Sequence, residues 1–207
     1  MNPIFAKGKT NERPESGSIA AGATSIPVTD ADSYFSVGDP IFISEDDGSE
    51  VEYLGPAISV SSSAIAVTYA LQQAKGPGYK VWEPTDFVLM PYGVSSPFDR
   101  TLALGVQTQR SPGGKVYRTK IADSYKQVML TWVKLKATSW AALESFIVIK
   151  LNDGIYKCTI GYEDHAQDKI VSVTATLLMD EIPHLELMRG LVRGEVPFQI
   201  DEEGAYL

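Results

Sequence analysis

The chain is poor in the side chains that perform most enzyme chemistry. Among 207 residues it has one cysteine, Cys158, and two histidines, His165 and His184. A single cysteine excludes an intrachain disulfide and any zinc or iron–sulfur site built from several thiolates. No stretch approaches the roughly 18–20 uninterrupted apolar residues that a membrane helix needs, and neither end carries a readable address signal. We therefore expect no membrane association.

Motifs for catalysis or cofactor binding are missing as well. The chain has no G-x-S-x-G, H-E-x-x-H, G-x-x-x-x-G-K-[ST] or G-x-G-x-x-G pattern. His165 lies between Asp164 and Asp168 in a polar turn, which favours a surface histidine over a catalytic base, and His184 sits in no nucleophile motif. Cys158 falls on the apolar face of a strand pattern and is expected to be a buried, inert thiol. The sequence thus predicts no enzyme, no catalytic residue and no cofactor.

Charge is unevenly distributed along the chain. The net charge is -8 and the pI about 4.8, which argues against nucleic acid as a partner. Residues 1–100 hold 6 Lys and Arg against 13 Asp and Glu, residues 101–178 hold 10 against 6, and residues 179–207 hold 2 against 7. A basic middle between acidic ends is typical of solvated faces, but it also allows copies of the chain to associate head to tail.

Two acidic clusters and one aromatic cluster are candidate binding sites. Glu45–Glu50 has the residue types of a calcium loop without the spacing, so we interpret it as a solvated hairpin tip, and Glu163-Asp164 with Asp168 in the same way. We expect no metal site. The aromatic residues of one strand-rich region suggest a sugar-binding or base-stacking platform, although aromatic residues at alternate strand positions usually belong to a core. These residues are Tyr53, Tyr79 and Trp82.

Short runs of β-branched residues separated by Gly, Pro, Asp and Ser predict strands and turns in the N-terminal half. Residues 1–17 have few apolar side chains and are expected to form an extended arm, either disordered or ordered on a neighbouring subunit. Residues 18–83 predict a small β-barrel or sandwich. In that module Asp47-Gly48 predicts a hairpin turn, and Pro27 an edge strand. A passage rich in proline, 83–97, is a candidate hinge, although its apolar middle also suits a core.

Residues 84–180 predict a second β domain with one packed α-helix. The helix is expected at about 139–149, with Thr138 or Ser139 as its N-cap, because apolar residues there recur at helical spacing. Strand 125–136 is apolar on both faces at its middle, which predicts burial between layers or under a subunit contact. Further strands are expected at 101–109, 116–121, 155–162 and 170–179.

The last part, 181–207, is acidic and is expected to form a C-terminal segment with a helical turn or two over 185–192. The predicted fold class is therefore mainly β. A small N-terminal β-barrel or sandwich module precedes a β-sandwich or barrel domain with one packed α-helix.

Both halves resemble structural proteins of tailed bacteriophages. Gly22–Ala31, Phe35–Ile43 and Glu50–Glu52 resemble a small β module found in such proteins. The second half is similar to tail-hub and distal tail proteins, in which two strand pairs and a helix packed across them build a ring-forming domain. This second similarity is carried by Arg110, Tyr117, Tyr125–Leu135, Trp140–Phe146 and Gly154–Cys158.

The resemblance implies a virion component without a catalytic site, assembled in the host cytoplasm. It would form a homo-oligomeric ring at the distal tail or baseplate and connect the tail tube to hub proteins. The N-terminal arm and the acidic C-terminal segment would then reach adjacent subunits, because ring closure demands a heterologous interface. The chain opens with the small module and not with the ring-forming domain, so a neck or tail-completion adaptor stays open. A carbohydrate- or surface-binding β module is the other alternative.

Overall fold

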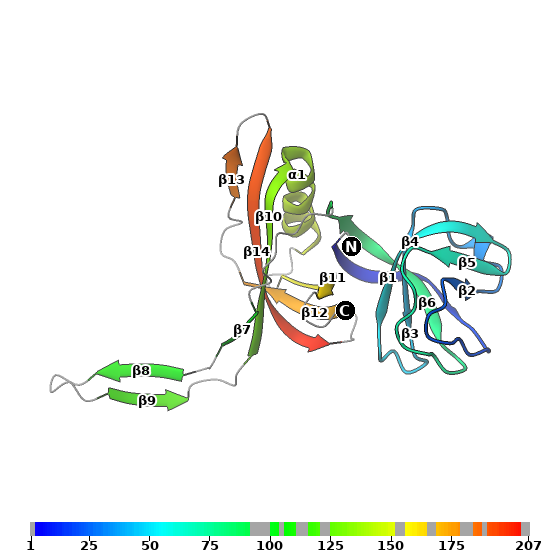
Figure 1. The fold of residues 1–207 in the computed structure, drawn as a ribbon, viewed down its shortest axis with the longest axis horizontal. Helices are drawn as coiled ribbons and strands as arrows, with labels where there is room; N and C mark the ends of the chain where they lie inside the picture. Colours follow the sequence, from blue (N-terminus) through cyan, green and yellow to red (C-terminus); the bar gives the residue numbers. More distant parts are fainter. Residues whose placement is uncertain are drawn as a thin grey trace.

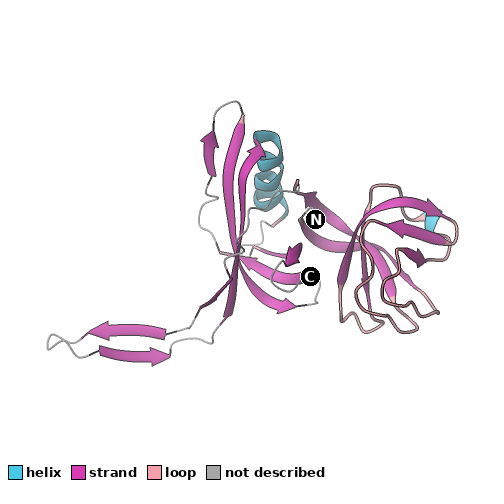
Figure 2. Cartoon of the chain, in the orientation of Figure 1, coloured by secondary structure: helices cyan, strands magenta, loops and turns pink. Residues whose placement is uncertain are grey.

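The computed structural model describes residues 3–91, 100–103, 106–110, 116–120, 125–151, 156–164, 169–178, 184–187 and 190–203. These residues are mainly β and contain one α-helix, which confirms the predicted fold class (Figure 2). The strands are β1 (Ile4–Pro14), β2 (Ser25–Pro27), β3 (Pro40–Ser44), β4 (Glu52–Ser61), β5 (Ala64–Val67), β6 (Lys80–Leu89), β7 (Arg100–Ala103), β8 (Val106–Arg110), β9 (Val116–Lys120), β10 (Tyr125–Lys136), β11 (Lys157–Asp164), β12 (Lys169–Leu177), β13 (His184–Leu187) and β14 (Leu191–Glu203). The helical segments are η1 (Ala31–Ser33), α1 (Ala137–Ser145) and η2 (Phe146–Lys150).

Twelve strands form one antiparallel sheet, in the order β2-β5-β4-β3-β6-β1-β11-β12-β14-β10-β7, with β13 added to β14. Figure 1 shows two lobes that meet at β1. We call residues 3–91, with β1 to β6, the N-terminal module, and the strands β7 and β10 to β14 with the helix the C-terminal lobe. Among the described strands, β8 and β9 pair only with each other, and we call them the ribbon. The ribbon extends away from both lobes (Figure 1).

The prediction of an arm over residues 1–17 is wrong. Residues 4–14 form β1, which lies inside the sheet between β6 and β11. The few apolar residues of this segment suffice because successive side chains of a strand enter opposite faces. Phe5 packs in the core of the C-terminal lobe, and Ile4 and Ala6 pack in a separate core at the junction of the two lobes. All three are 0% exposed, so β1 joins the lobes of its own chain.

The candidate hinge over 83–97 is not found where the structure describes it. Strand β6 runs without a break from Lys80 to Leu89 and pairs with β1 over most of that length. Pro84 is tolerated in this strand because pairing with β3 ends at Trp82, so no second ladder needs its missing N–H. The predicted boundary at 83/84 therefore falls inside a strand, while 92–99 lie outside the described residues.

The local signals of the N-terminal module are confirmed. Strands β3 and β4 form the hairpin predicted at Asp47-Gly48, where Gly48 has a φ of 83° and donates its N–H to the Glu45 carbonyl at 3.0 Å. β2 lies at the end of the sheet, as Pro27 predicts. The Pro27 carbonyl accepts a hydrogen bond from the Tyr79 hydroxyl at 2.6 Å. This edge thus offers a further strand little to pair with.

The predicted helix is confirmed, with a different start. It begins at Ala137, its N-cap is Lys136 without a side-chain cap, and it continues as the π-helical segment η2 to Lys150. Its inner face packs on β10 and β14 in the core of the C-terminal lobe. The approach is close at Gly194, where an added Cβ would lie 2.2 Å from the Trp140 ring. The helix residues buried there are Trp140, Leu143, Phe146 and Ile147.

Within the single chain β10 is buried on one face only, so it does not lie between two layers of its own chain, and cover of the other face by a neighbouring subunit stays a prediction. Val128, Leu130 and Trp132 are buried, while Val133 is 45% exposed. The pairing of β10 with β14 shifts between Trp132 and Leu135, and Leu135 is buried although its position in the sequence is odd. A bulge adds one residue to the strand and turns the following side chains to the other face. Leu135 therefore enters the same core as Val128, Leu130 and Trp132.

The acidic C-terminal segment forms strands where the structure describes it, and the described residues of 185–192 are not helical. β13 and β14 form a hairpin around Gly190, which has a φ of 69°. β14 then runs from Leu191 to Glu203 between β10 and β12. Its acidic residue Asp201 is held within the sheet, at 2.7 Å from the Thr176 hydroxyl and 3.5 Å from Lys157 Nζ. The segment is thus a central strand of its own lobe.

The strand pair predicted at 155–162 and 170–179 is confirmed as β11 and β12. Its polar face is buried too, because the N-terminal module covers it: the Tyr53 N–H donates to the Ser172 hydroxyl at 3.1 Å. An added Cβ at Gly161 would lie 2.8 Å from the Ile4 side chain. Alternating small and polar residues on this face therefore allow the two lobes to approach each other.

Candidate interaction surfaces

The residues with catalytic potential do not converge within the described structure. Cys158 is 0% exposed in the core of the C-terminal lobe, and burial raises the pKa of its thiol, so it stays protonated. His165 lies outside the described residues. His184 belongs to β13 and pairs with Gly194 of β14. Throughout the described ranges, no three side chains of His, Cys, Asp or Glu gather as metal ligands do.

Carboxylates of the acidic hairpin tip, Glu45–Glu50, accept hydrogen bonds from the N-terminal module itself. Asp47 accepts the Ser49 N–H at 2.9 Å, and hydrogen bonds from the Ser49 side chain first and from this backbone N–H second lower the pKa of the Asp47 carboxyl. Glu45 accepts the Gly76 N–H, at 3.2 Å from one carboxylate oxygen and 3.3 Å from the other. These carboxylates therefore stabilise turns. Of the second acidic group, Asp168 lies outside the described residues, so that pattern stays a prediction.

Lys75 links the 75–78 turn to the β3–β4 hairpin through ion pairs. The side chain of Lys75 is 0% exposed, and its Nζ lies 2.9 Å from Glu52 and 3.6 Å from Glu50. Glu52 also accepts the backbone N–H groups of Gln72 and Gln73, at 2.7 and 3.0 Å. A buried charge that is paired and hydrogen-bonded in this way is structural.

The three aromatic residues considered as a platform are buried. Tyr53 and Tyr79 are each 1% exposed, and Trp82 is 0% exposed. The Tyr53 ring lies 4.9 Å from the Phe42 ring, centroid to centroid, in the junction core, and burial raises the pKa of the Tyr53 hydroxyl. Tyr53 and Trp82 pack in the junction core and Tyr79 packs in the core of the N-terminal module, so none of the three rings offers a stacking surface to a sugar or a base.

A pair of carboxyl groups lies at the surface of the N-terminal module. Glu83 is hydrogen-bonded to Asp39, and burial, followed by repulsion from Asp39, raises the pKa of Glu83 to about 7. Asn11 donates its side-chain N–H to Glu83 at 2.8 Å and to the Tyr34 carbonyl at 2.8 Å. The pair therefore ties β1 and β6 to the loop that leads into β3.

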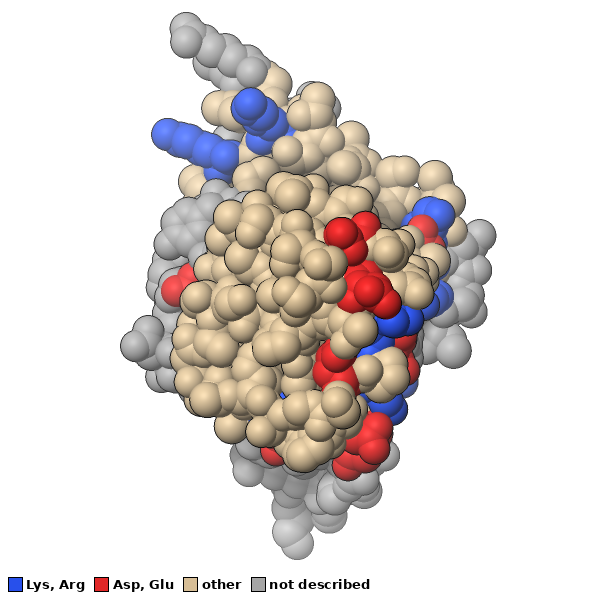
Figure 3. Space-filling view, turned by 90° about the vertical axis from the view of Figure 1, so that its right-hand side faces the viewer, with Lys and Arg blue, Asp and Glu red and all other residues tan. Residues whose placement is uncertain are grey.

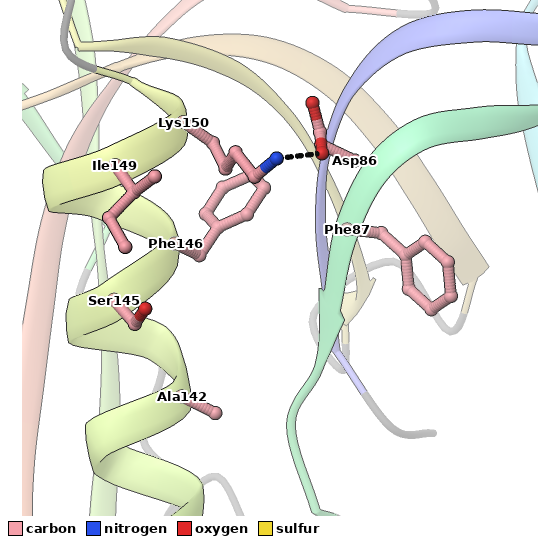
Figure 4. A pocket seen from close by; sticks show the side chains of 7 residues that line it. All are labelled: Asp86, Phe87, Ala142, Ser145, Phe146, Ile149 and Lys150. Atoms are coloured by element: carbon pink, nitrogen blue, oxygen red, sulfur yellow. Dashed lines mark ion pairs between the residues drawn. The ribbon is translucent and has the colours of Figure 1, made fainter.

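A small cavity of about 190 Å³ lies where β6 faces the helical segment (Figure 4). Lys150 Nζ and Asp86 Oδ1 form an ion pair at 2.7 Å across it, and Lys7 donates to the Lys150 carbonyl at 3.3 Å. Phe87 and Ile149 also line the cavity. Ligand pockets usually enclose about 300–1,000 Å³, so this hollow is too small to be a substrate site.

The outer face of α1 and η2 exposes small and apolar residues next to the polar side chains of Thr138 and Lys150. Ala141, Ala142 and Ser145 are exposed there, followed by Val148 at 61% and Ile149 at 64%. Because polar and charged side chains lie among them, this face is not a continuous apolar surface that needs cover by other protein.

The ribbon stands away from the two lobes as a two-stranded hairpin (Figure 1). Its register pairs Val106 with Lys120, Thr108 with Arg118 and Arg110 with Val116. The two strands together contain Arg110, Arg118 and Lys120 and no Asp or Glu. A two-stranded ribbon alone is at best marginally stable in water. The strands predicted at 101–109 and 116–121 are thus found, although 101–103 belong to β7, which pairs with β10.

Comparisons with known proteins leave the family open: no family model, curated protein or solved structure matches the chain. None of the helices in the described ranges has the length and apolar character needed to cross a membrane.

Proposed function

We propose that the protein is a structural subunit of a tailed-bacteriophage virion that assembles with copies of itself into a ring at the distal tail or baseplate. It would connect the tail tube to hub proteins and perform no catalysis. The sequence resemblance in both halves of the chain motivates the viral assignment. The same building block would also suit a neck or tail-completion adaptor, because both positions require rings of identical subunits.

The single observation that carries the proposal is the ribbon. A hairpin that pairs only with itself and extends from the body gains stability when it lies on another surface. Its strands are basic, with Arg110, Arg118 and Lys120 and no Asp or Glu, whereas the N-terminal module holds 12 Asp and Glu against 5 Lys and Arg in residues 3–91. Opposite charges at two ends of one molecule favour head-to-tail contact between copies.

The carbohydrate-binding alternative is not carried forward, because Tyr53, Tyr79 and Trp82 are buried. The head-to-tail contact through the ribbon does not require the free N-terminal arm or the acidic tail that the sequence predicted as contacts between subunits. Both of those segments are strands of their own subunit.

Negative-stain electron microscopy of the purified chain tests the proposal. We expect rings for the natural chain and no rings for the double variant Arg110→Gln with Arg118→Gln, which removes two charges from the ribbon. The matched control, Lys134→Gln with Lys136→Gln, removes the same charge from exposed positions of β10 and should keep the rings. Single particles without rings for the natural chain, or unchanged rings for the ribbon variant, would contradict head-to-tail assembly.

Immunogold labelling of purified phage particles separates the viral assignment from the assembly. Label at the tail or neck of the particles is the expected result. Rings in the purified protein together with particles that carry no label would overturn the virion assignment and leave the assembly standing.

A further inference from the structure

Two segments of the N-terminal module carry no charged residue. Ser16–Thr29 and Tyr53–Ala74 contain no Asp, Glu, Lys or Arg over 36 residues in total. At the overall content of 21% charged residues, a stretch of that size would carry about eight. The rest of the same module is strongly acidic, so charge is excluded locally and is not scarce in general.

The fold brings the two segments together at one end of the molecule. β2 belongs to the first segment, and β5 and most of β4 belong to the second; β5 pairs with both of the other strands. Figure 3 looks at this end and shows a broad face without charged side chains, bordered on one side by a column of acidic and basic residues. We call this end the uncharged face.

Exposed apolar residues lie on and beside this face. Ile58 in β4 is 60% exposed, and Val37 is 68% exposed. Both are near each other, because Gly38 donates its N–H to the Ala57 carbonyl at 2.9 Å. Hydroxyl side chains, such as those of Ser61–Ser63, are exposed around them. Interfaces are depleted of charged residues at their centre, and this composition meets that condition.

The charge pattern indicates which partner fits. A basic partner would be held best by acidic residues, which the module has in excess elsewhere. An acidic partner is repelled by the rest of the module but not by the uncharged face, and contact there leaves no charge desolvated without a partner. A second copy of this chain is an acidic protein that carries the same face.

We propose that two copies of the chain bind each other through their uncharged faces, related by a two-fold axis. Side chains must form this contact, because Pro27 and the Tyr79 hydroxyl leave the β2 edge little capacity for strand pairing. The contact goes beyond the proposed function, since it uses another surface than the ribbon. Combined with ring formation, it would join two rings back to back.

Sedimentation velocity of the full-length ribbon variant, Arg110→Gln with Arg118→Gln, tests this contact in the absence of the ribbon contact. We expect a dimer of twice 22.5 kDa whose dissociation constant stays equal or falls when NaCl rises from about 50 to about 500 mM. Added Ile58→Glu should raise the dissociation constant at least about tenfold, because two-fold symmetry places both new carboxylates in one interface.

The matched control adds Val148→Glu to the same ribbon variant. Val148 is 61% exposed on the helical segment, so the change in charge, size and exposure is similar, and dimerisation should be unaffected. Circular dichroism checks that both variants are folded. A monomer at every concentration, a dimer that dissociates on adding salt, or equal dimerisation of the Ile58→Glu and Val148→Glu variants would overturn the proposal. Failure of the natural chain to form rings would leave it standing if this dimer persists.

Discussion

Replacing Gly161 with alanine is expected to disturb the contact between the N-terminal module and the C-terminal lobe. The added Cβ would lie 2.8 Å from Ile4 Cγ2 and 3.1 Å from Tyr53 Cδ1. Neither neighbour has room to move away, because Ile4 is 0% and Tyr53 1% exposed. The backbone of Gly161 is outside the left-handed region, so the cost comes from packing and not from strain in φ.

The magnitude follows from two opposing effects. Overpacking a filled core costs about 1–3 kcal/mol, while replacing glycine restricts the unfolded chain and returns about 0.4–1 kcal/mol. We therefore expect a net loss of about 1–2 kcal/mol. In a chain of this length, 1 kcal/mol corresponds to about 2–4 °C, so Tm should fall by about 2–8 °C.

Thermal unfolding followed by circular dichroism at one protein concentration measures this loss, since association shifts apparent stability. Gly17→Ala is the matched control, because no atom lies within 4 Å of the added Cβ, and its Tm should be unchanged or slightly raised. Equal Tm values for Gly161→Ala and Gly17→Ala would refute the close packing of the two lobes.

Two further predictions concern charges in the N-terminal module. Lys75→Met leaves the Glu52 carboxylate without its partner at 2.9 Å and should cost about 3 kcal/mol in urea unfolding. Glu50→Gln removes an exposed partner at 3.6 Å and should cost less than about 1 kcal/mol; the opposite ranking would contradict the role of the buried pair. For pH, burial and the neighbouring Asp39 raise the pKa of Glu83 from 4.5 to about 7. A raised folded-state pKa means that protonation stabilises the fold below about pH 4.5 and that this contribution is lost as pH rises through 7. Glu83→Gln should therefore reduce the decline in unfolding free energy between about pH 5 and 7, and an unchanged slope would refute the assignment.

Local sequence signals predicted local structure well. Asp47-Gly48 specifies a hairpin through residues adjacent in sequence, and Pro27 restricts its strand to an edge. The helix was predictable from apolar spacing, although its start was not, because Lys136 provides no side-chain cap. In each case the structure depends on neighbours within a few positions along the chain.

Structure that depends on distant residues was not predictable in the same way. β1 is polar over most of its length, and its place in the sheet comes from pairing with β6 and β11, far along the chain. Segment 185–192 has a spacing compatible with a helical turn, yet a glycine with positive φ and the long partner strand β10 make a hairpin and a central strand. In β10 a bulge brings Leu135 into the same core as Val128, Leu130 and Trp132.

For the candidate surfaces too, the local composition was predictable from the sequence and the contacts between distant segments were not. The absence of charge over Ser16–Thr29 and Tyr53–Ala74 is visible in the sequence, but only the pairing of β2, β4 and β5 joins the two segments into one face. The basic residues of the ribbon were visible as part of a basic middle region. Their location in one hairpin that stands away from both lobes required the structure.

Static light scattering of the natural chain over a range of concentrations tests most directly whether this protein is a self-assembling subunit. If the protein forms rings, its mass at low ionic strength should be at least that of three chains of 22.5 kDa, because a ring needs three or more subunits. Added salt should lower the mass, since the ribbon contact is electrostatic. A mass of 22.5 kDa at every concentration and salt level would contradict the account.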